Sequence, residues 1–427
     1  MQVSSKKLPR GQAEVTVVLT VAEYQPFLQQ TAAGISMRLS IPGFRPGKAP
    51  YSIVVEKIGE GKLWEEALEP AVKRTYAKAM TESKFITIGS PQIAILTIAP
   101  GNPISYRATV NLLPDVELPE LEKISITRKK VEVTDAEVES TLDDIRKMRR
   151  TEKLVDRPAV ANDKVEVKLQ TFQENVPVEN GQVEKLPLVL GEKKFLPEVE
   201  QHIIGLKAGQ DSAFTVKLPT DYHNRTVAGK TVEFRIKILG VYELTLPEVN
   251  DDFAKSVGHF TSVTDLREKV KASLMHDASK REDERLENEI IEAIINKSKF
   301  TDIPDLLVTT ETKNMLAELE QQISRQEVSF DDYLTHLKKT RAELLLDFTP
   351  TAMKRVKGAL VTRAVAKQQK TEINENEIDA IIQQEFADQG DDPKLTERTK
   401  NPAFRAHIQN ILASRKVMEY LKATVVK

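Results

Sequence analysis

The spacing of apolar residues predicts alternating strands and helices early in the chain. Residues 12–20 alternate apolar and polar side chains and predict a strand, whereas residues 21–37 predict a helix. Residues 51–83 also predict a helix, because apolar side chains recur there every three or four positions. Residues 84–113 return to strand patterns interrupted by glycine and proline turns. We therefore expect residues 1–113 to form a compact α+β domain with a loop between its helices.

The next segment, residues 114–157, is predicted to be a linker that contains one helix. Residues 114–133 are extended and punctuated by proline, and a capping box at residues 134–137 begins the helix. The helix ends in the basic run of residues 146–150. Such a run is typical of a solvated helix end, where cations complement the helix dipole.

Residues 158–244 are predicted to form a second, smaller α+β domain. A short helix over residues 195–206 is expected to end at Gly205, which suits a left-handed helix cap. Strand patterns begin at Asp163 and recur at residues 186–191, 213–219 and 232–238.

Residues 245–427 are predicted to be an all-α domain. The expected helices are residues 264–298, 305–326, 329–346, 350–369, 374–389 and 401–422, with Pro350 separating two of them. Their apolar stripes are thin and heavily flanked by charge, and one of them contains Met315, Leu316, Leu319 and Ile323. Such helices bury little area per residue and suit open arms better than a dense bundle. The chain is therefore predicted to be an α+β multidomain protein.

Composition narrows the classes of function. With 62 basic and 64 acidic side chains the net charge is -2, which excludes a global nucleic-acid-binding field. The chain has no cysteine, so disulfides, thiolate metal sites and cysteine nucleophiles are excluded. It has no secretory signal pattern and no apolar run of about 20 residues. We therefore expect a cytoplasmic protein without a membrane partner.

Motifs of catalysis and cofactor binding are missing from the sequence. The six histidines are scattered, and none is paired at the spacing of zinc ligands. The phosphate-binding, dinucleotide-binding and nucleophile-elbow glycine motifs do not occur. We expect no metal and no cofactor, and these patterns favour a binding protein over an enzyme.

One loop, residues 41–50, carries the strongest functional signal. Its two glycines and three prolines exclude a regular helix or strand and favour an ordered turn. The turn presents one aromatic side chain, Phe44, and two cations, Arg45 and Lys48. Since an exposed aromatic among turn residues has no local core to enter, we expect a partner to cover it.

The loop is similar to the G-F-R-x-G-K-x-P signature of trigger factors, a family of ribosome-associated bacterial chaperones. Gly89-Ser90-Pro91, residues 112–119, and Tyr222-His223 followed by residues 228–230 also resemble family segments. The order of domains agrees over essentially the whole chain. The resemblance implies a ribosome-binding domain, an FKBP-like peptidyl-prolyl isomerase domain, and a helical C-terminal chaperone domain with two arms.

The resemblance also implies partners. In the family the loop docks on the large ribosomal subunit near the exit tunnel, on protein and ribosomal RNA. Carried over, the ribosome-binding residues are Gly43, Phe44, Arg45, Pro46, Gly47 and Lys48. Nascent polypeptides are the implied clients of the arms, where we assign Met315, Leu316, Leu319 and Ile323. A homodimer off the ribosome is a further behaviour that the family shows.

The isomerase pocket departs from the family pattern. An FKBP-type pocket is an apolar, aromatic-lined hole that desolvates the X-Pro bond, with no covalent step. The residues assigned to it here are Tyr222, Phe234, Phe195 and Leu196. Lys168-Leu169 stands where the family has an Asp-Phe pair, and Val178 and Val199 replace aromatic residues. We expect these losses to enlarge the pocket and weaken prolyl binding. His223 is a weaker candidate, for which a hydrogen bond within the loop is the simpler role.

Our main interpretation is an ATP-independent chaperone at the exit tunnel, and two alternatives remain open. The first is a working FKBP-type isomerase as the main role, and the second is a helical scaffold protein without a ribosome partner. The sequence therefore leaves isomerase activity uncertain.

Overall fold

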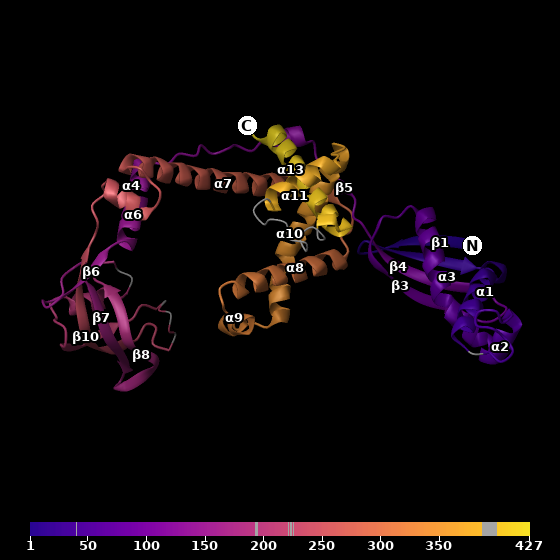
Figure 1. Cartoon of the computed structure of the whole chain (residues 1–427), viewed down its shortest axis with the longest axis horizontal. Coiled ribbons are helices and arrows are strands. Elements are labelled where there is room, and N and C mark those ends of the chain that lie inside the picture. Colours follow the sequence, from indigo (N-terminus) through magenta and orange to yellow (C-terminus); the bar gives the residue numbers. More distant parts are fainter. Residues whose placement is uncertain (40, 193–194, 221, 223, 225, 387–398) are drawn as a thin grey trace. The chain divides into compact units, whose positions relative to one another are not determined.

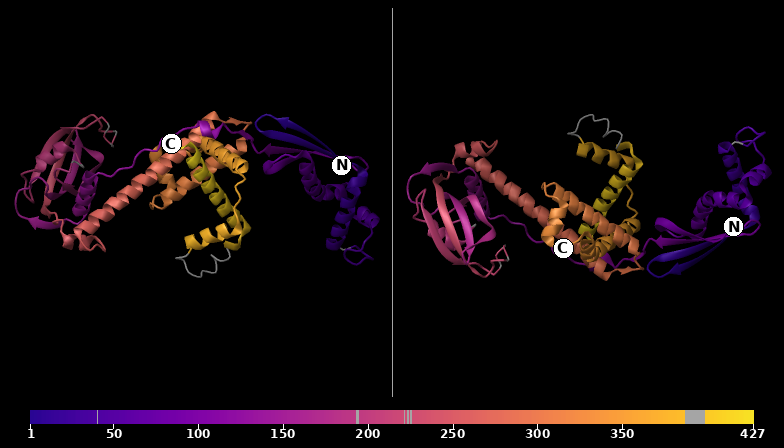
Figure 2. Two further views of the ribbon diagram at one scale, coloured as in Figure 1. Left: turned by 90° about the horizontal axis from the view of Figure 1, so that it is seen from above. Right: turned by 90° about the horizontal axis from the view of Figure 1, so that it is seen from below.

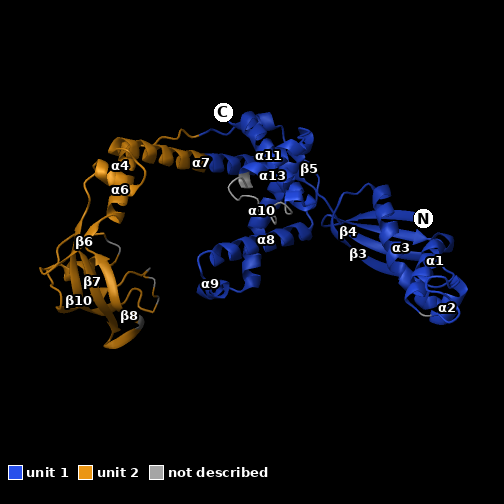
Figure 3. Ribbon diagram, viewed as in Figure 1, with its two compact units in different colours: residues 1–128, 283–427 blue, residues 129–282 orange. Residues whose placement is uncertain are grey.

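The computed structural model describes residues 1–39, 41–192, 195–220, 222, 224, 226–386 and 399–427. The chain divides into two compact units, residues 1–128 with 283–427 and residues 129–282 (Figure 3). His223, the end of the helix expected over residues 374–389 and the turn at residues 391–393 lie outside the described residues. No helix within the described part is both long and apolar enough to cross a membrane.

The N-terminal part of unit 1 is a four-stranded antiparallel sheet with helices on one face (Figure 1). Its strands run in the order β1-β2-β4-β3 and comprise β1 (Gln2–Leu8), β2 (Gln12–Leu19), β3 (Thr87–Thr97) and β4 (Ile104–Leu112). The helices are α1 (Val21–Arg38), α2 (Tyr51–Ile58) and α3 (Glu60–Ser83). Both views of Figure 2 place these helices on one side of the sheet.

Burial of alternate residues of β2 and β4 against α1 and α3 builds this core. Val15, Val17 and Tyr106 are fully buried, as expected for strands with one face covered. Trp64 is also buried, and the Tyr24 hydroxyl donates a hydrogen bond of 2.6 Å to the Trp64 carbonyl. The prediction that Trp64 packs in the core is therefore confirmed.

Two local predictions for this region need correction. The expected helix over residues 51–83 breaks into α2 and α3 at Gly59, whose φ of +86° no helix residue adopts. Strand β1 was not predicted, because its QVSSKKL sequence contains too few apolar residues to alternate clearly. Pairing with β2 along its whole length supplies the stability that its own side chains lack.

The second part of unit 1 is a helical body. It contains η1 (Leu121–Lys123), α8 (Asp305–Ser324), α9 (Phe330–Leu337), α10 (Arg341–Gln368), α11 (Glu375–Phe386), α13 (Pro402–Val425) and the short strands β5 (Val116–Glu117) and β11 (Lys299–Phe300). Its largest core joins the end of α7 (Val263–Lys297) to α10 and α13. Ile290, Val361 and Leu421 are fully buried there.

Pro350 does not separate two helices, contrary to the prediction. The break lies earlier, at Lys338, whose φ of +52° ends α9. A capping box between Thr340 and Glu343 then begins α10, which continues through Pro350. A proline inside a helix removes one hydrogen bond, and packing of α10 against α8 keeps the helix continuous.

Unit 2 is built on a five-stranded antiparallel sheet. Its strands are β6 (Thr151–Val155), β7 (Lys164–Gln173), β8 (Val176–Val189), β9 (Asp211–Lys217) and β10 (Thr231–Thr245). The long strand β10 pairs with β7 along one edge and with β6 and β9 along the other. Helix α5 (Pro197–Ile203) packs on the sheet through the fully buried Val199 and Ile203.

Unit 2 also contains a small helical cluster. Helix α4 (Asp135–Met148) packs against α6 (Asp251–Val257) and the first turns of α7. Leu142, Phe253 and Leu266 form the centre of this contact. The capping box predicted at Thr134 is confirmed, with the Thr134 hydroxyl accepting from the Glu137 N–H.

Candidate functional site

The loop of residues 41–50 is an ordered turn anchored to the core of the N-terminal sheet and helices. Ile41 is buried in that core, and Ala49 packs against it at the other end of the loop. The Phe44 N–H donates to the Ile41 carbonyl at 3.2 Å, and the Gly47 N–H donates to Ser36 in α1 at 2.9 Å. The tip is therefore held in place from both sides, as preorganised binding requires.

Two glycines are required by this backbone. Gly43 has a φ of +88° and Gly47 a φ of +80°, where a side chain is strained. A Cβ at Gly47 would also lie 2.9 Å from the Cγ of Met37. Gly47 therefore serves both the turn and the close approach of the loop to the end of α1.

The tip of the loop exposes the aromatic and cationic groups that its sequence predicts. Phe44 is 41% exposed, which is unusual for a phenylalanine. Arg45 and Lys48 are exposed on the same turn, closed by a 2.9 Å hydrogen bond from the Lys48 N–H to the Arg45 carbonyl. Neither cation forms an ion pair with any residue that the structure describes. Both are therefore available to an anionic partner.

Two further apolar side chains beside the loop escaped the sequence interpretation. Met37 is 68% exposed and Leu39 is 37% exposed, and both lie at the end of α1 next to the turn. We call Met37, Leu39 and Phe44 the loop apolar patch. The sequence signal for it is that Met37 lies off the stripe of buried residues of α1, such as Leu28 and Ile35. Arg38, between them, pairs with Glu66 at 3.5 Å.

Unit 2 contains a small apolar cavity of about 150 Å³ at the position expected for an isomerase pocket. Three of the four predicted residues line it, namely Tyr222, Phe234 and Phe195. Burial raises the pKa of the Tyr222 hydroxyl. The rings of Phe195 and Phe234 meet edge to face, with centroids 6.5 Å apart.

The positions at which this chain departs from the family pattern do not all lie at this cavity. Leu169 and Val178 line it, whereas Val199 is a residue of α5 that is fully buried in the core of unit 2. Leu196 does not line the cavity, because it precedes α5 and packs against the core. Val178 approaches Gly181 closely, and the volume is small for a ligand pocket. Enlargement relative to other pockets of the family stays a prediction.

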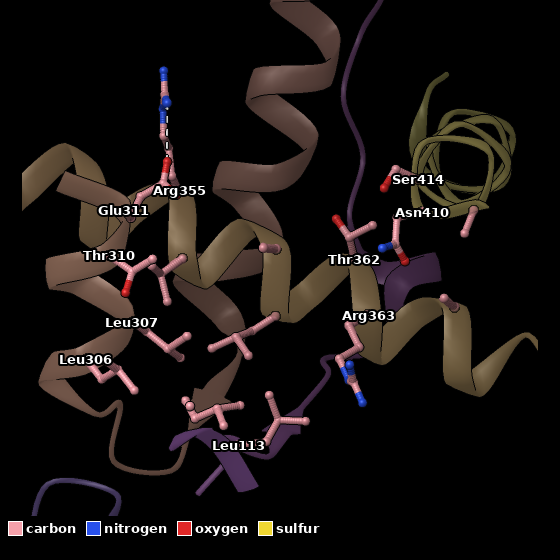
Figure 4. A pocket seen from close by; sticks show the side chains of 17 residues that line it. Leu113, Leu306, Leu307, Thr310, Glu311, Arg355, Thr362, Arg363, Asn410 and Ser414 are labelled. Atoms are coloured by element: carbon pink, nitrogen blue, oxygen red, sulfur yellow. Dashed lines mark hydrogen bonds and ion pairs between the residues drawn. The ribbon is translucent and has the colours of Figure 1, made fainter. Parts of the chain in front are cut away.

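A much larger cavity, about 850 Å³, lies in unit 1 (Figure 4). We call it the body cavity. Helices α8, α10 and α13 line it, together with the start of β3 and Leu113. Leu306 and Leu307 of α8 and Leu113 supply apolar walls, while Asn410 and Ser414 of α13 supply polar groups. Its size and mixed lining suit a peptide segment.

Two arginines line the body cavity. Arg355 pairs with Glu318 at 2.9 Å and Glu311 at 3.2 Å, and its pKa is raised mainly by the hydrogen bond to Glu318. Arg363 is exposed and forms no ion pair within the described ranges. The cavity therefore offers one cation to a bound chain. Sequence patterns do not reveal the cavity, because its lining residues are spread along the chain from Ile88 to Ser414.

The residues assigned to client binding lie elsewhere in the same helical body. Met315, Leu316 and Ile323 are each less than 10% exposed, and Leu319 is half-buried. Met315 packs against α10, while Leu316 packs with Leu334 and Leu344. In this structure the stripe joins α8 to α9 and α10. Client contact by these four residues stays a prediction.

Clusters of metal-ligating side chains are absent from the part of the chain that the structure describes. No group of three or more histidine, aspartate or glutamate side chains is arranged there to hold a metal ion. The chemistry available at these sites is binding. The loop can bind an anionic surface, the cavity of unit 2 can bind an apolar side chain, and the body cavity can bind a peptide segment.

Comparison with known proteins gives one family for the N-terminal and C-terminal parts of the chain and an FKBP-type match between them. The sequence model described as "Bacterial trigger factor protein (TF)" matches residues 1–145, and that of its C-terminus matches residues 262–423. The model of the FKBP-type peptidyl-prolyl cis-trans isomerase matches residues 155–239.

Individual relatives agree with these matches. A trigger factor of Carboxydothermus hydrogenoformans is 30% identical over 382 residues, which cover 89% of each chain. A trigger factor of Clostridium tetani is 30% identical over 380 residues, 88% of each chain. A solved structure titled "Promiscuous Substrate Recognition in Folding and Assembly Activities of the Trigger Factor Chaperone" covers 99% of both chains with a TM-score of 0.51. At 19% identity that likeness supports the fold alone.

We predict that Gly47→Ala lowers the free energy of unfolding by about 1–2 kcal/mol, because a side chain is strained at this φ and would meet Met37. Urea unfolding of the full chain measures the change. Gly61→Ala is the matched control, since Gly61 lies in α3 with nothing near its Cβ position. It should raise stability by about 0.5–1 kcal/mol. Equal effects of the two changes would contradict the required backbone at Gly47.

Proposed function

Because the chain belongs to the trigger factor family, we propose that it is a ribosome-associated chaperone that holds nascent chains at the exit tunnel without ATP. The observation that carries the proposal is the ordered loop with an exposed aromatic and two cations that form no ion pair among the described residues. The absence of a phosphate-binding motif from the sequence supports action without nucleotide.

Docking uses the loop on the large ribosomal subunit, where both protein and ribosomal RNA are exposed. Arg45 and Lys48 meet carboxylates or phosphates, and charge-assisted hydrogen bonds of this kind are strong. Phe44 enters an apolar depression and supplies the buried anchor. The glycines let the backbone approach the partner closely. Ribosome binding should consequently weaken as the salt concentration rises.

Client binding uses the helical body. We place it at the body cavity and its rim, where Leu306 and Leu307 are accessible, together with the predicted stripe on α8. Shallow apolar contacts interrupted by charge bind many sequences weakly and release them without an energy source. Tethering at the ribosome raises the effective concentration of this surface near emerging chains.

The pocket of unit 2 is proposed to bind prolyl side chains weakly. Three rings line it, Phe195, Tyr222 and Phe234, but Leu169 and Val178 stand at family aromatic positions. Fewer aromatic walls give less dispersion contact with a proline ring. The match to the FKBP-type family over residues 155–239 favours the second candidate, a working isomerase.

Off the ribosome, self-association is proposed to use the loop apolar patch. Met37, Leu39 and Phe44 expose apolar surface that water disfavours. A second copy and the ribosome would then compete for the same residues. Ribosome binding should therefore dissociate any homodimer.

We predict that the triple variant Phe44→Ala, Arg45→Ala, Lys48→Ala loses at least about tenfold in ribosome affinity, because each contact removed is central to the loop. Co-sedimentation with ribosomes measures it. The double variant Lys6→Ala, Lys7→Ala removes two exposed cations from β1 of the same domain and should pellet like the wild type. Equal pelleting of the triple variant and wild type would reject docking by the loop.

We predict slow isomerisation of a proline-containing test peptide by the wild type, with little further loss in Tyr222→Ala. A protease-coupled assay measures the rate. Tyr242→Ala is the control, because the Tyr242 hydroxyl contacts Glu166 and its ring does not line the cavity. A fast wild-type rate that disappears only in Tyr222→Ala would establish the isomerase as a main activity.

We predict that Leu306→Ser with Leu307→Ser weakens suppression of aggregation of an unfolded test protein several-fold, since both side chains line the body cavity. Light scattering measures suppression. Leu346→Ser is the matched control, because Leu346 is 73% exposed on α10 and does not line the cavity. If the control variant lost as much activity as the double variant, client binding at the cavity would be wrong.

A further inference from the structure

The two edges of the N-terminal sheet are protected differently. Strand β1 forms one edge and carries Lys6 and Lys7, whereas β3 forms the other and contains no charged residue from Thr87 to Thr97. Natural sheets commonly place lysine on an edge strand, because the charge discourages the addition of another strand. In a chain with 30% charged residues, an edge without any charge is a distinct feature.

The regular part of this edge is short and well defined. The register of β3 against β4 shifts between Ile88 and Gln92 and again between Ile95 and Thr97. Residues 92–95 therefore pair regularly with β4, and we call them the β3 edge segment. Bulges limit the pairing of an edge strand. Here the two register shifts flank four residues that pair regularly with β4, and no strand among the described residues lies beside their outer side.

Apolar side chains accompany this open backbone. Ile93 pairs with Ala108 and Ile95 with Tyr106, so both isoleucines share the face of the sheet that β4 buries against the helices. Yet each isoleucine is 38% exposed, because the helices do not cover the sheet as far as its edge. The apolar face thus continues to the edge and stays open there.

The backbone of the segment is also available. Strand β3 pairs only with β4 in the sheet, and no other backbone hydrogen bond joins residues 92–95 to the described residues of the chain. In an antiparallel pair, alternate N–H and C=O groups of an edge strand point away from its neighbour. These groups are ready to pair with an added strand.

We propose that the β3 edge segment binds an extended stretch of an unfolded client chain as an additional strand of the sheet. This proposal rests on the chaperone function above and names a second client site for it. Strand addition uses main-chain hydrogen bonds, which any sequence except proline can supply. Ile93 and Ile95 then contact alternate side chains of the client, which favours apolar segments.

The contact area favours a client chain over a second copy of the protein. Four residues at about 3.4 Å each, in a sheet about 10 Å thick, present about 140 Å² of edge to a partner. A stable dimer needs about 1,000 Å² in total. The contact area between two β3 edges alone is far below this value. A peptide that binds weakly and exchanges needs no larger contact area than the β3 edge segment provides.

The edge also continues into the body cavity. Ile88 and Gly89, at the start of β3, line that cavity, and the missing side chain of Gly89 makes room for Leu306. A client strand on the edge segment therefore leads towards the cavity at one end. Two weak sites joined by one client chain bind more tightly than either alone.

The experiment places a charge on the edge segment and an equal charge on the opposite edge. Ser4, Thr16, Arg107 and Ala94 form one cross-strand row, so Ser4 and Ala94 occupy equivalent positions on the two edges. The variants are Ala94→Lys and Ala94→Glu, with Ser4→Lys and Ser4→Glu as matched controls. The probe is reduced, carboxamidomethylated α-lactalbumin, a permanently unfolded chain.

Both Ala94 variants should weaken binding of this probe about tenfold, because a charge on an edge strand discourages the addition of another strand. The Ser4 variants should bind like the wild type. Testing both signs of charge separates blocking of the edge from electrostatics with the probe. A loss with only one sign, or equal losses in the Ser4 controls, would overturn strand addition.

Hydrogen–deuterium exchange of the wild-type chain provides a test that needs no variant. Addition of the probe should slow exchange of the outward amides in residues 92–95. Unchanged exchange there would overturn the proposal. Exchange of these amides should not depend on protein concentration when the probe is absent. If exchange became slower at higher protein concentration, a second copy would be the occupant and the proposal would be overturned.

The same measurements separate this inference from the chaperone function. If Leu306→Ser with Leu307→Ser weakens probe binding while both Ala94 variants bind normally, strand addition is wrong and the chaperone function stands. If the wild type does not bind the probe at all, the proposed function fails as well.

Discussion

Burial of one face of β2 and β4 against α1 and α3 is the constraint on which the exposed loop of residues 41–50 depends. Because α1 and α2 are both fixed to this core, the twelve residues between them (39–50) have set end points. Ile41 is buried at one end of the loop, and Gly47 hydrogen-bonds back to Ser36 of α1. Phe44 is thereby held in solvent, although water disfavours it, and the core supplies the stability that this exposure costs.

The two proposed client sites, the body cavity and the β3 edge segment, share a different property, since each is incompletely covered. The body cavity is walled by leucines but also carries Arg363 and Asn410. The β3 edge lies just beyond the reach of the helices that cover the rest of its sheet. Weak apolar contact over several separated places allows binding without a defined client sequence. The pocket of unit 2 is more enclosed and smaller, which suits a single side chain better than a chain segment.

Predictions from sequence were most accurate where the physics is local. The capping box at Thr134 and the turn around Gly43 and Gly47 depend only on neighbouring residues, and the structure contains both. They were less accurate where packing competes with propensity. Pro350 lies within α10 because the contact with α8 outweighs the lost hydrogen bond. Strand β1 forms because β2 offers it a partner, not because of its own sequence.

The sequence alone was enough to recognise the family and the exposed loop of residues 41–50, since the loop's chemistry resides in consecutive residues. Tertiary structure decided which apolar side chains remain exposed. Met315 and Leu316 belong to a stripe like any other, yet α9 and α10 bury them, whereas Met37 and Ile95 stay open. Exposure depends on neighbours far away in the chain, and no local pattern contains that information. For the same reason the body cavity, with walls from β3, α8, α10 and α13, exists only in the folded protein.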